Sequence, residues 1–427
     1  MKVLVVGGGG REHALAWRLA VSPSVDAVES APGNPGMAEL GPVHPDIDDA
    51  DPQAVADLAA GRGIDLVVVG PEAPLVAGVA DAVRERGILC FGPSAAAAEI
   101  EGSKSFAKDV MEAAGVATAA SGTYDDRDEA VAALANFSPP YVVKADGLAA
   151  GKGVVIADDR DDAVAAIEDA LVHGRFGEAG ATVVLEAFLD GPEVSVFGVC
   201  DGTDVALLPP SQDFKRAYDG DEGPNTGGMG AYTPVPDFGV EDAAALKDSV
   251  FRPVLAELER RGARFQGLLY AGLVLTASGP QVLEFNCRFG DPETQSVIWR
   301  VASDFGDLLA AAADPERGVA DHTLEVSDDA YVTVVLASGG YPLSYETGET
   351  ILGLDAVRDR FEDVHVFHAG TASRDGQIVT AGGRVLGVTA HGSDVAAARE
   401  RAYEAADLIT WAGQHRRNDI AEQAARS

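Results

Sequence analysis

Short β-branched runs alternate with alanine-rich amphipathic segments from residue 2 to about residue 100, and this alternation constrains the fold more than any other feature. The runs read KVLVVG, DAVES, IDLVVVG and GILCFG. Strands that alternate with helical segments pair in parallel, because each crossover helix returns the chain to the same edge of the sheet. The pattern therefore predicts an open, doubly wound parallel sheet in the N-terminal domain.

The first predicted strand runs through four glycines, Gly7 to Gly10, into a helix that begins at REHALAW. Backbone N–H groups and the helix dipole bind anions at such a junction, so we expect a monophosphate site, with a plain tight turn as the alternative. A dinucleotide fingerprint would need a glycine where Glu12 stands. Glu29, at the end of the next strand, keeps a dinucleotide-dependent oxidoreductase open as an alternative.

The length of 427 residues corresponds to roughly three domains. No run approaches the ~18 apolar residues of a membrane span, and the first residues lack the basic start and the cleavage site of a secretory signal. Three distant cysteines suggest neither a disulfide framework nor a metal motif. We therefore expect a cytoplasmic protein with no membrane partner.

The formal net charge of −36 argues against a nucleic-acid partner, because phosphate backbones attract basic surfaces. Acidic residues gather in stretches such as HPDIDDADPQ and DDRDEA, a distribution that fits a halophilic protein. Seven lysines occur against 25 arginines, and four of the seven lie in or beside glycine-rich stretches. That distribution favours a role for these lysines as point charges on phosphate.

The segment KADGLAAGKGVV, residues 144 to 155, looks at first like a P-loop. A P-loop needs four residues between its glycines and a hydroxyl residue after its lysine, whereas Gly147 and Gly151 enclose three residues and Gly153 replaces the hydroxyl. The segment instead joins two predicted strands, PYVVKADG and GVVIA, so it resembles a flap that covers phosphates with its N–H groups. Two later strands, TVVLEAF and EVSVFGVC, are expected to form a further pair.

Metal ligands are predicted in VLEFNCRFGDPETQ. Side chains alternate along a strand, so Glu284, Asn286 and Arg288 share one face. The opposite face, directed to the core, carries Phe285, Cys287 and Phe289. Glu284 and Asn286 offer hard oxygens suited to magnesium, and Arg288 can fork onto an anionic intermediate. A salt-bridged structural strand is the alternative.

The preceding strand, GLLYAGLVLT, has no carboxylate, so we expect two protein ligands for the metal, with phosphate and water as the others. The segment SQDFKRAYDGDEGPNTGGMG is too glycine-rich and too charged for a core connection. We interpret it as a loop that closes over substrates, with Asp213 and Lys215 near the reacting groups. An ordinary long connection is the alternative.

Residues from about 328 onward predict a small α+β domain with a helix that starts at Asp394. His365 and His368 are expected to be structural, because their spacing on a strand puts them on opposite faces. Arg384 is a candidate for closing the active site.

Eight motifs span nearly the whole chain in this order: GGREHA, VGPEAPL, EGSKSFAKD, VVKADGLAAGKGV, SQDFKRAYDGDEGPNTGGMGAY, GLLYAGL, EFNCRFGDPETQ and FHAGT with TAGGRVL. Jointly they resemble the phosphoribosylamine–glycine ligase family of purine biosynthesis. The resemblance implies an ATP-grasp fold of α/β and α+β class, in which DGLAAGKG is the flap. It also implies an N-terminal substrate-phosphate-binding domain at 1–101, an ATP-grasp domain at 102–327 with its flap at about 120–192, and a C-terminal domain at 328–427.

The family's reaction fits these residues. ATP phosphorylates the carboxylate of glycine, and the amine of 5-phosphoribosylamine attacks the glycyl phosphate to give glycinamide ribonucleotide, ADP and phosphate. Since the nucleophile belongs to a substrate, no serine elbow or HExxH motif is needed, and the sequence has neither. The implied cofactors are ATP and Mg²⁺ or Mn²⁺, the partners are these small molecules, and the expected state is a monomer.

Site residues follow from the motifs and the resemblance together. Two lysines, Lys104 and Lys144, neutralise ATP phosphates. The flap and adenine pocket then add Gly151, Lys152, Gly153, Glu186, Phe188 and Leu189, and Glu193 takes the ribose hydroxyls. The substrate-binding residues are Gly9, Gly10, Arg11, Glu12, Gly227, Gly228 and Asp291. We expect the catalytic residues to be Asp213, Lys215 and Arg288, and the metal ligands to be Glu284 and Asn286.

Two further alternatives stay open beside the oxidoreductase. Another ATP-grasp ligase or carboxylase would share the flap and EFN but use a different acceptor. A non-catalytic nucleotide-binding module would not need the metal pair.

Overall fold

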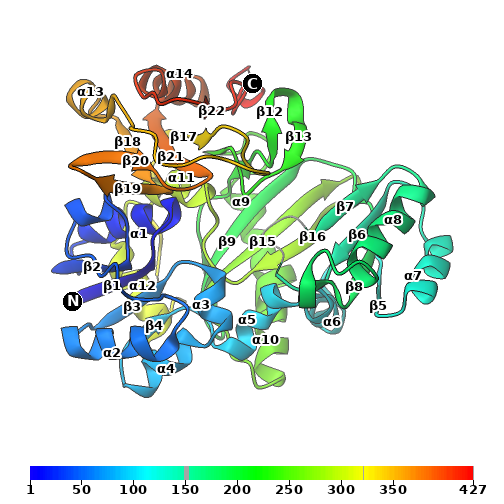
Figure 1. The fold of residues 1–427 in the computed structure, drawn as a ribbon. Helices are drawn as coiled ribbons and strands as arrows, with labels where there is room; N and C mark the ends of the chain where they lie inside the picture. The colour runs from blue at the N-terminus through cyan, green and yellow to red at the C-terminus, as the bar shows by residue number, and fades with distance from the viewer. Residues whose placement is uncertain (149–152, 321, 427) are drawn as a thin grey trace.

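The computed structural model describes residues 1–148, 153–320 and 322–426. Figure 1 shows the N-terminal sheet at the lower left, the flap sheet at the right, and the C-terminal domain above the N-terminal sheet. A central sheet lies between the N-terminal domain and the flap. Among the described residues, no helix combines the length and the apolar composition that crossing a membrane requires.

The N-terminal sheet is parallel throughout and has the order β2-β1-β3-β4, as the sequence predicts. Its strands are β1 (Lys2–Gly7), β2 (Ala27–Pro32), β3 (Leu66–Val69) and β4 (Leu89–Phe91). Alternate residues of β1 enter two separate clusters: Leu4 and Val6 pack with α2 (Pro52–Arg62) and α4 (Val79–Glu85), whereas Val3 and Val5 pack with α1 (Gly10–Ala20). Helices therefore cover both faces, which is the doubly wound arrangement.

The flap sheet is antiparallel with the order β5-β8-β6-β7. It contains β5 (Ser121–Tyr124), β6 (Tyr141–Ala145), β7 (Val154–Ala157) and β8 (Val183–Ala187), with α7 (Arg127–Ala133) and α8 (Arg160–Leu171) packed on it. Lys144 pairs with Val154, so the glycine-rich segment does join two antiparallel strands, as predicted.

The expected pairing of TVVLEAF with EVSVFGVC is wrong. The first of these segments is β8, which pairs with β5 and β6, whereas the second forms β9 (Glu193–Asp201) in the central sheet. The residues between them, Phe188 to Pro192, carry the chain from one sheet to the other instead of turning it back as a hairpin. Sequence proximity therefore does not translate into pairing here, because each strand finds its partners in a different sheet.

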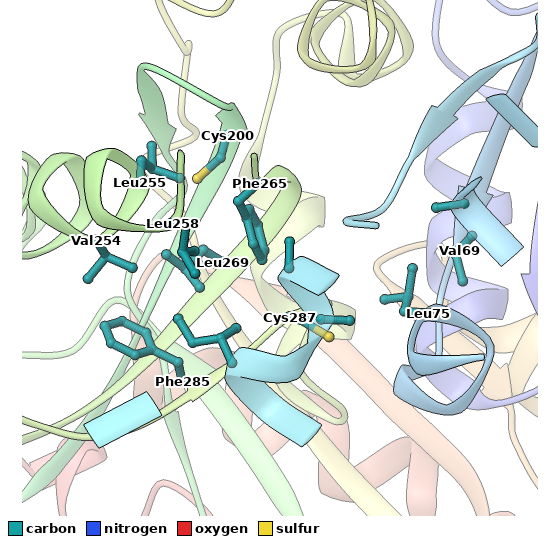
Figure 2. Close-up of a cluster of buried hydrophobic side chains, with 14 of the residues drawn as sticks. Val69, Leu75, Cys200, Val254, Leu255, Leu258, Phe265, Leu269, Phe285 and Cys287 are labelled. Atoms are coloured by element: carbon teal, nitrogen blue, oxygen red, sulfur yellow. The ribbon is translucent and has the colours of Figure 1, made fainter. Parts of the chain in front are cut away.

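The central sheet has the order β10-β9-β15-β16, with β10 (Val205–Leu207), β15 (Gln266–Thr276) and β16 (Gly279–Asn286). Its core is formed with α10 (Arg252–Arg260), which follows α9 (Val240–Leu246) and a short π-helix (Lys247–Phe251). Figure 2 shows Phe285 beside Leu258 and Leu269, and Cys287 in the same cluster on the side of Leu75. The predicted core-directed face of the metal strand is therefore confirmed for these two residues.

The C-terminal sheet has the order β11-β14-β17-β21-β18, and β22 also pairs with β17. Its long strands are β17 (Ala330–Ser338), β18 (Val364–His368) and β21 (Arg384–Gly392). Two short strands, β11 (Gln212–Asp213) and β14 (Gly230–Thr233), come from the two ends of the glycine-rich segment 211–230. This segment is therefore anchored at both ends in the C-terminal sheet, although it lies far from that domain in the sequence.

The remaining elements connect or cover these sheets. The helices are α3 (Glu72–Val76), α5 (Ala95–Gly102), α6 (Lys104–Ala114), α11 (Glu293–Arg300), α12 (Phe305–Ala313), α13 (Leu354–Arg360) and α14 (Val395–Ala406). The short strands are β12 (Arg216–Tyr218), β13 (Glu222–Asn225), β19 (Thr371–Arg374), β20 (Gln377–Thr380) and β22 (Gln414–His415). Asp394 caps α14 by accepting a hydrogen bond from Ala397 N–H, so the predicted helix start is confirmed.

Three histidines gather where β18 packs on α1. The His13 ring lies 5.8 Å from the His365 ring and 5.7 Å from the His368 ring, and His13 Nδ1 accepts a hydrogen bond of 2.8 Å from His368 N–H. Both rings border His13 at the end of β18. The expectation that His365 and His368 are structural stays a prediction. Burial lowers the pKa of His365 and of His368 to about 4, and that of His13 also falls well below its usual value.

We predict that these histidines make the fold acid-sensitive between about pH 6.5 and 4. In the unfolded chain they bind protons below about pH 6.5, whereas the folded chain resists protonation down to about pH 4. The unfolded state therefore binds more protons in this window, so the histidines' stabilisation is complete above it and falls as the pH falls through it. Between these pH values the free energy of unfolding should therefore fall by about 1 to 3 kcal/mol less in His365→Phe than in the natural chain.

The measurement is urea unfolding at several pH values, compared between the natural chain and H365F. The two pH profiles must be subtracted, because other groups also titrate in this range. Burial raises the pKa of Glu293 to about 7, so Glu293 stabilises the fold in acid and opposes the effect of the histidines. The exposed His173, replaced by phenylalanine, is the matched control. Identical pH profiles for the natural chain and H365F would contradict the prediction.

Candidate active site

Two lysines flank one buried carboxylate under the flap. Lys144 Nζ lies 3.0 Å from Glu186 Oε1, and Lys108 Nζ lies 3.1 Å from Glu186 Oε2. All three side chains are buried, and they come from β6, α6 and β8. The Glu186 carboxylate therefore orients the two lysines. If Glu186 contacts the adenine as predicted, it must do so through atoms other than its carboxylate. Phe188 and Leu189 follow directly after β8, and the Phe188 side chain is exposed.

Lys104 begins α6 and reaches the base of the flap. Its Nζ donates a hydrogen bond of 3.0 Å to Gly147 O and one of 3.4 Å to Asp146 O. Burial lowers the pKa of Lys104, although the nearby Glu284 carboxylate acts against this shift. On the flap's other side, Ala145 N–H donates a 2.7 Å hydrogen bond to Gly153 O. Gly151 and Lys152 lie outside the described residues.

The predicted metal strand is β16, and it faces the flap lysines. Lys144 Nζ lies 3.5 Å from Leu283 O, beside Glu284. Glu284 pairs with Gly272 on β15, where an added Cβ would approach Glu284 Cγ to 3.3 Å. A glycine opposite Glu284 therefore leaves room for the carboxylate to turn. Between Glu284 and Val282 the pairing shifts by one residue, a bulge of the kind that often re-aims a side chain.

Arg288 lies just beyond β16 and links three parts of the chain. Its guanidinium donates to Glu101 Oε1 at 2.8 Å, to Glu72 Oε2 at 3.2 Å and to Asn286 Oδ1 at 3.4 Å. The bond to Asn286 agrees with the predicted shared face. Phe289 leaves that strand pattern and packs instead against Phe91, in a different cluster from Phe285 and Cys287. The reason is that β16 ends at Asn286, so alternation does not extend this far.

Lys215 lies between two carboxylates, with its Nζ 2.8 Å from Asp213 Oδ1 and 2.8 Å from Glu193 Oε2. Burial alone would lower the pKa of Lys215, but the charges of Asp213 and Glu193 outweigh it and raise the pKa well above its usual value. Lys215 is therefore a fixed positive charge. The Glu284 carboxylate also raises the pKa of Lys215, although less than Asp213 and Glu193 do, so the predicted metal strand lies near the predicted catalytic pair.

The glycine-rich junction before α1 is partly filled by its own side chains. Glu12 accepts a 2.7 Å hydrogen bond from Gly9 N–H, and the Arg11 Nε–H donates to Glu12 at 2.5 Å. Arg11 also donates to Phe289 O at 3.0 Å and is buried. The first helical hydrogen bond runs from His13 N–H to Gly9 O, so the N–H groups of Gly10 and Arg11 have no acceptor within the helix. These two N–H groups are the best candidates for holding a phosphate.

Gly227, Gly228 and Asp291 meet at Arg384. The guanidinium donates to Gly227 O at 2.5 Å and to Asp291 O at 2.6 Å, and it lies 3.1 Å from Asp291 Oδ2. Gly228 has a φ of +111°, and an added Cβ would lie 2.4 Å from Pro292 Cδ, so only glycine fits. Asp291 Oδ1 in turn accepts a 2.9 Å hydrogen bond from the buried Gln295.

Glu29, the acid that kept the dinucleotide alternative open, is fully engaged elsewhere. Its carboxylate contacts Lys2 at 2.5 Å, His44 at 2.7 Å and Arg62 at 2.9 Å, and it is 2% exposed. Hydrogen bonding to Arg62 and Lys2 lowers the pKa of Glu29 to about 2. A ribose hydroxyl would have to displace Lys2, His44 and Arg62, so Glu29 is not available as the ribose-binding acid of an oxidoreductase.

The donor set fits a hard divalent cation that is shared with phosphates. Within the described residues, no group of three or more His, Cys, Asp or Glu side chains could hold a metal ion on its own. Glu284 and Asn286 supply one carboxylate and one amide oxygen, and the lysines that would neutralise phosphates lie next to them. Such a pair suits Mg²⁺, which usually keeps phosphate oxygens and water in its shell.

Several residues of the site were not predicted from the sequence. Glu72 and Glu101 hold Arg288, and Lys108 shares Glu186 with Lys144. Lys108 is one of only seven lysines in the chain, so the rarity of lysine was a signal that could have pointed to it. Glu72 and Glu101 carried no such signal, because acidic residues are common throughout this chain.

A flap sheet and a central sheet that enclose basic side chains, next to a Glu/Asn strand, define an ATP-grasp protein. The chain belongs to the phosphoribosylglycinamide synthetase family. The family's N domain matches residues 1–101, its ATP-grasp (A) domain residues 102–294 and its C domain residues 331–423.

Relatives match over the whole length. The protein of Streptomyces coelicolor named phosphoribosylamine–glycine ligase is 54% identical over 427 residues and covers 100% of both chains. A protein of the same name from Mycobacterium bovis is 51% identical, covering 100% of this chain and 99% of its own. The crystal structure of phosphoribosylamine–glycine ligase from Thermotoga maritima is 33% identical, has a TM-score of 0.83, and covers 99% of this chain and 100% of its own.

The fold also occurs in more distant proteins. The biotin carboxylase domain of the Hydrogenobacter thermophilus 2-oxoglutarate carboxylase is 16% identical and has a TM-score of 0.73, covering 99% of this chain and 97% of its own. At this identity the likeness concerns the fold alone.

Proposed function

We propose that this chain is an ATP-dependent ligase that joins glycine to 5-phosphoribosylamine through a glycyl phosphate, in purine biosynthesis. One arrangement supports the proposal: Lys144 Nζ lies 3.5 Å from Leu283 O, the residue before Glu284, and the Glu284 carboxylate acts on the charge of Lys104. Positive side chains beside a metal-binding acid match what phosphoryl transfer requires. The relatives named phosphoribosylamine–glycine ligase supply the choice of substrates.

In the proposed reaction the protein supplies position and charge rather than a nucleophile. Lys104 and Lys144 would neutralise ATP phosphates, and Glu284 with Asn286 would hold Mg²⁺ or Mn²⁺. The metal supplies neutralisation of charge on the transferred phosphoryl group. Lys215, kept charged by Asp213 and Glu193, faces the glycine carboxylate and the leaving phosphate. Arg384 holds Gly227, Gly228 and Asp291 around the amine substrate.

The substrate assignment is tested by supplying ATP, magnesium, glycine and freshly generated phosphoribosylamine, and detecting glycinamide ribonucleotide by mass. Alternative acids in place of glycine separate this activity from that of another ATP-grasp ligase or carboxylase. Phosphate release with another acid, and none with glycine, would overturn the assignment. ATP binding without turnover on any acid would favour a non-catalytic module.

The setting of the enzyme is also proposed. We infer a cytoplasmic monomer that acts on small molecules, without nucleic-acid or membrane partners. The net charge of −36 supports the absence of a nucleic-acid partner. Sedimentation of the purified chain, with and without nucleic acid, tests both the monomer and the absence of binding.

We predict that the midpoint of thermal unfolding rises steeply between about 0.1 and 3 M potassium chloride. Sixty-eight acidic residues outnumber 32 basic ones, so unpaired carboxylates repel one another until cations screen them. Chloride is used because sulfate stabilises most proteins by exclusion from their surface. A flat or falling midpoint would remove the halophilic interpretation and leave the enzyme assignment untouched.

A further inference from the structure

The last residues of the chain bind the β12–β13 hairpin, which lies about 200 positions earlier in the sequence. Figure 1 shows the C terminus and β22 beside β12. His415, on β22, makes a 2.8 Å hydrogen bond to Ala217 O, and its ring lies 5.5 Å from the Tyr218 ring. We call residues 414–420 the C-terminal strap. Because β22 also pairs with β17, the strap fastens the hairpin to the C-terminal sheet.

Arg417 is the centre of this contact. Its side chain is 1% exposed, and its guanidinium lies 4.9 Å from the Phe214 ring. It donates to Asp221 Oδ1 at 2.7 Å and to Arg216 O at 3.2 Å, so it binds both the tip of the hairpin and the start of β12. Asp419 of the strap holds it in place through two hydrogen bonds of 2.7 Å.

The strap also binds the tip of the hairpin. Asn418 donates from its backbone to Asp219 Oδ1 at 2.7 Å and from its side chain to Asp219 Oδ2 at 3.1 Å. Gly220 N–H donates to Asp419 Oδ2 at 2.8 Å. The strap therefore binds β12 and the tip of the hairpin.

The hairpin is an extension of the segment that carries the proposed catalytic pair. Phe214 stands between Asp213 and Lys215, and side chains alternate along an extended chain. Phe214 packs with the C-terminal core and Arg417, whereas Asp213 and Lys215 meet each other and Glu193. Holding Phe214 on one side thus fixes the direction of Lys215 on the other.

We propose that Arg417 is a positioning residue for the ligase reaction, because it holds Phe214 and the hairpin so that Lys215 stays aimed at the reacting groups. This inference rests on the proposed function. A guanidinium suits the task, since its planar fork binds a carboxylate and a carbonyl while it stacks on a ring.

The test compares Arg417→Met with Arg416→Met. Methionine keeps an apolar stem against Phe214 and removes every donor. Arg416 is the neighbouring residue and pairs with Asp407, away from the hairpin, so it is the matched control. We expect R417M to lower kcat by about 10-fold or more, because small misplacements of reacting groups are costly. The ATP affinity of R417M should stay within about 2-fold of the natural value, and so should the kcat of R416M.

Two further measurements keep the test decisive. Asp221→Asn removes the negative charge that pairs with Arg417 at an exposed position, so it should fold and reproduce part of the loss. Hydrogen exchange should rise in residues 214–225 of R417M and stay unchanged in β6 and β7 of the flap. Natural kcat per folded molecule, with unchanged exchange in 214–225, would overturn the proposal. This outcome differs from a failure of the proposed ligase function. In that case the natural chain itself would form no product, whereas hydrogen exchange in residues 214–225 of R417M could still be measured.

Discussion

Replacing Glu284 with glutamine is expected to lower turnover roughly 100-fold or more, while ATP affinity changes only a few-fold. Glutamine keeps the size of the side chain but removes the negative charge that holds the metal between phosphates during transfer. Since Lys104 and Lys144 still neutralise ATP, binding should largely survive. Steady-state phosphate release across a magnesium titration, together with equilibrium binding of ATP, gives both quantities.

The exposed acid Glu259 on α10, changed to glutamine, is the matched control for charge. It should leave turnover unchanged. Natural turnover by E284Q at saturating magnesium would remove Glu284 from the metal site. A loss of ATP binding as large as the loss of turnover would assign Glu284 to nucleotide binding instead.

Replacing Lys144 with methionine should weaken ATP binding by about 10-fold or more and lower turnover further. The Lys144 ammonium is buried beside Glu186 and next to β16, where the phosphates are expected. Its loss removes a positive charge from a poorly solvated place, in which the attraction to phosphate is strong.

Lys108 provides a sharp comparison, because it contacts the same carboxylate from the opposite side. If Lys144 serves only to pair with Glu186, then Lys108→Met and Lys144→Met should weaken ATP binding equally. The account predicts a clearly larger effect at Lys144, with a similar loss of thermal stability for both. Equal ATP affinities in K108M and K144M would show that Lys144 is structural.

Local patterns in the sequence predicted those parts of the fold and site that depend on neighbouring residues. Period-two alternation put Phe285 and Cys287 in the core and left Glu284 and Asn286 opposite them. In the structure Phe285, on β16, and Cys287, just after it, do lie in the core. The parallel N-terminal sheet followed equally well, because its crossover helices lie between its strands in the sequence. The position of Lys144 before Val154 across a glycine loop was predictable for the same reason.

Features that depend on long-range pairing were not predictable in this way. Residues 212–213 and 230–233 join the C-terminal sheet, and Arg417 reaches Asp221 across the chain. Nothing in the local composition of DFKRAYDGDEG indicates that partner. The bulge near Leu283 and the ending of β16 at Asn286, which sent Phe289 to another cluster, likewise depend on the packing of neighbouring elements.

If ATP phosphorylates the carboxylate of glycine, as we propose, oxygen labelling will show it in the released phosphate. Glycine with both carboxylate oxygens as ¹⁸O is supplied with unlabelled ATP, magnesium and phosphoribosylamine, and the released phosphate is analysed by mass spectrometry. If a glycyl phosphate forms, attack of the amine breaks the bond between carbon and the bridging oxygen, so each phosphate carries one ¹⁸O atom. Unlabelled phosphate, formed together with glycinamide ribonucleotide, would contradict the account.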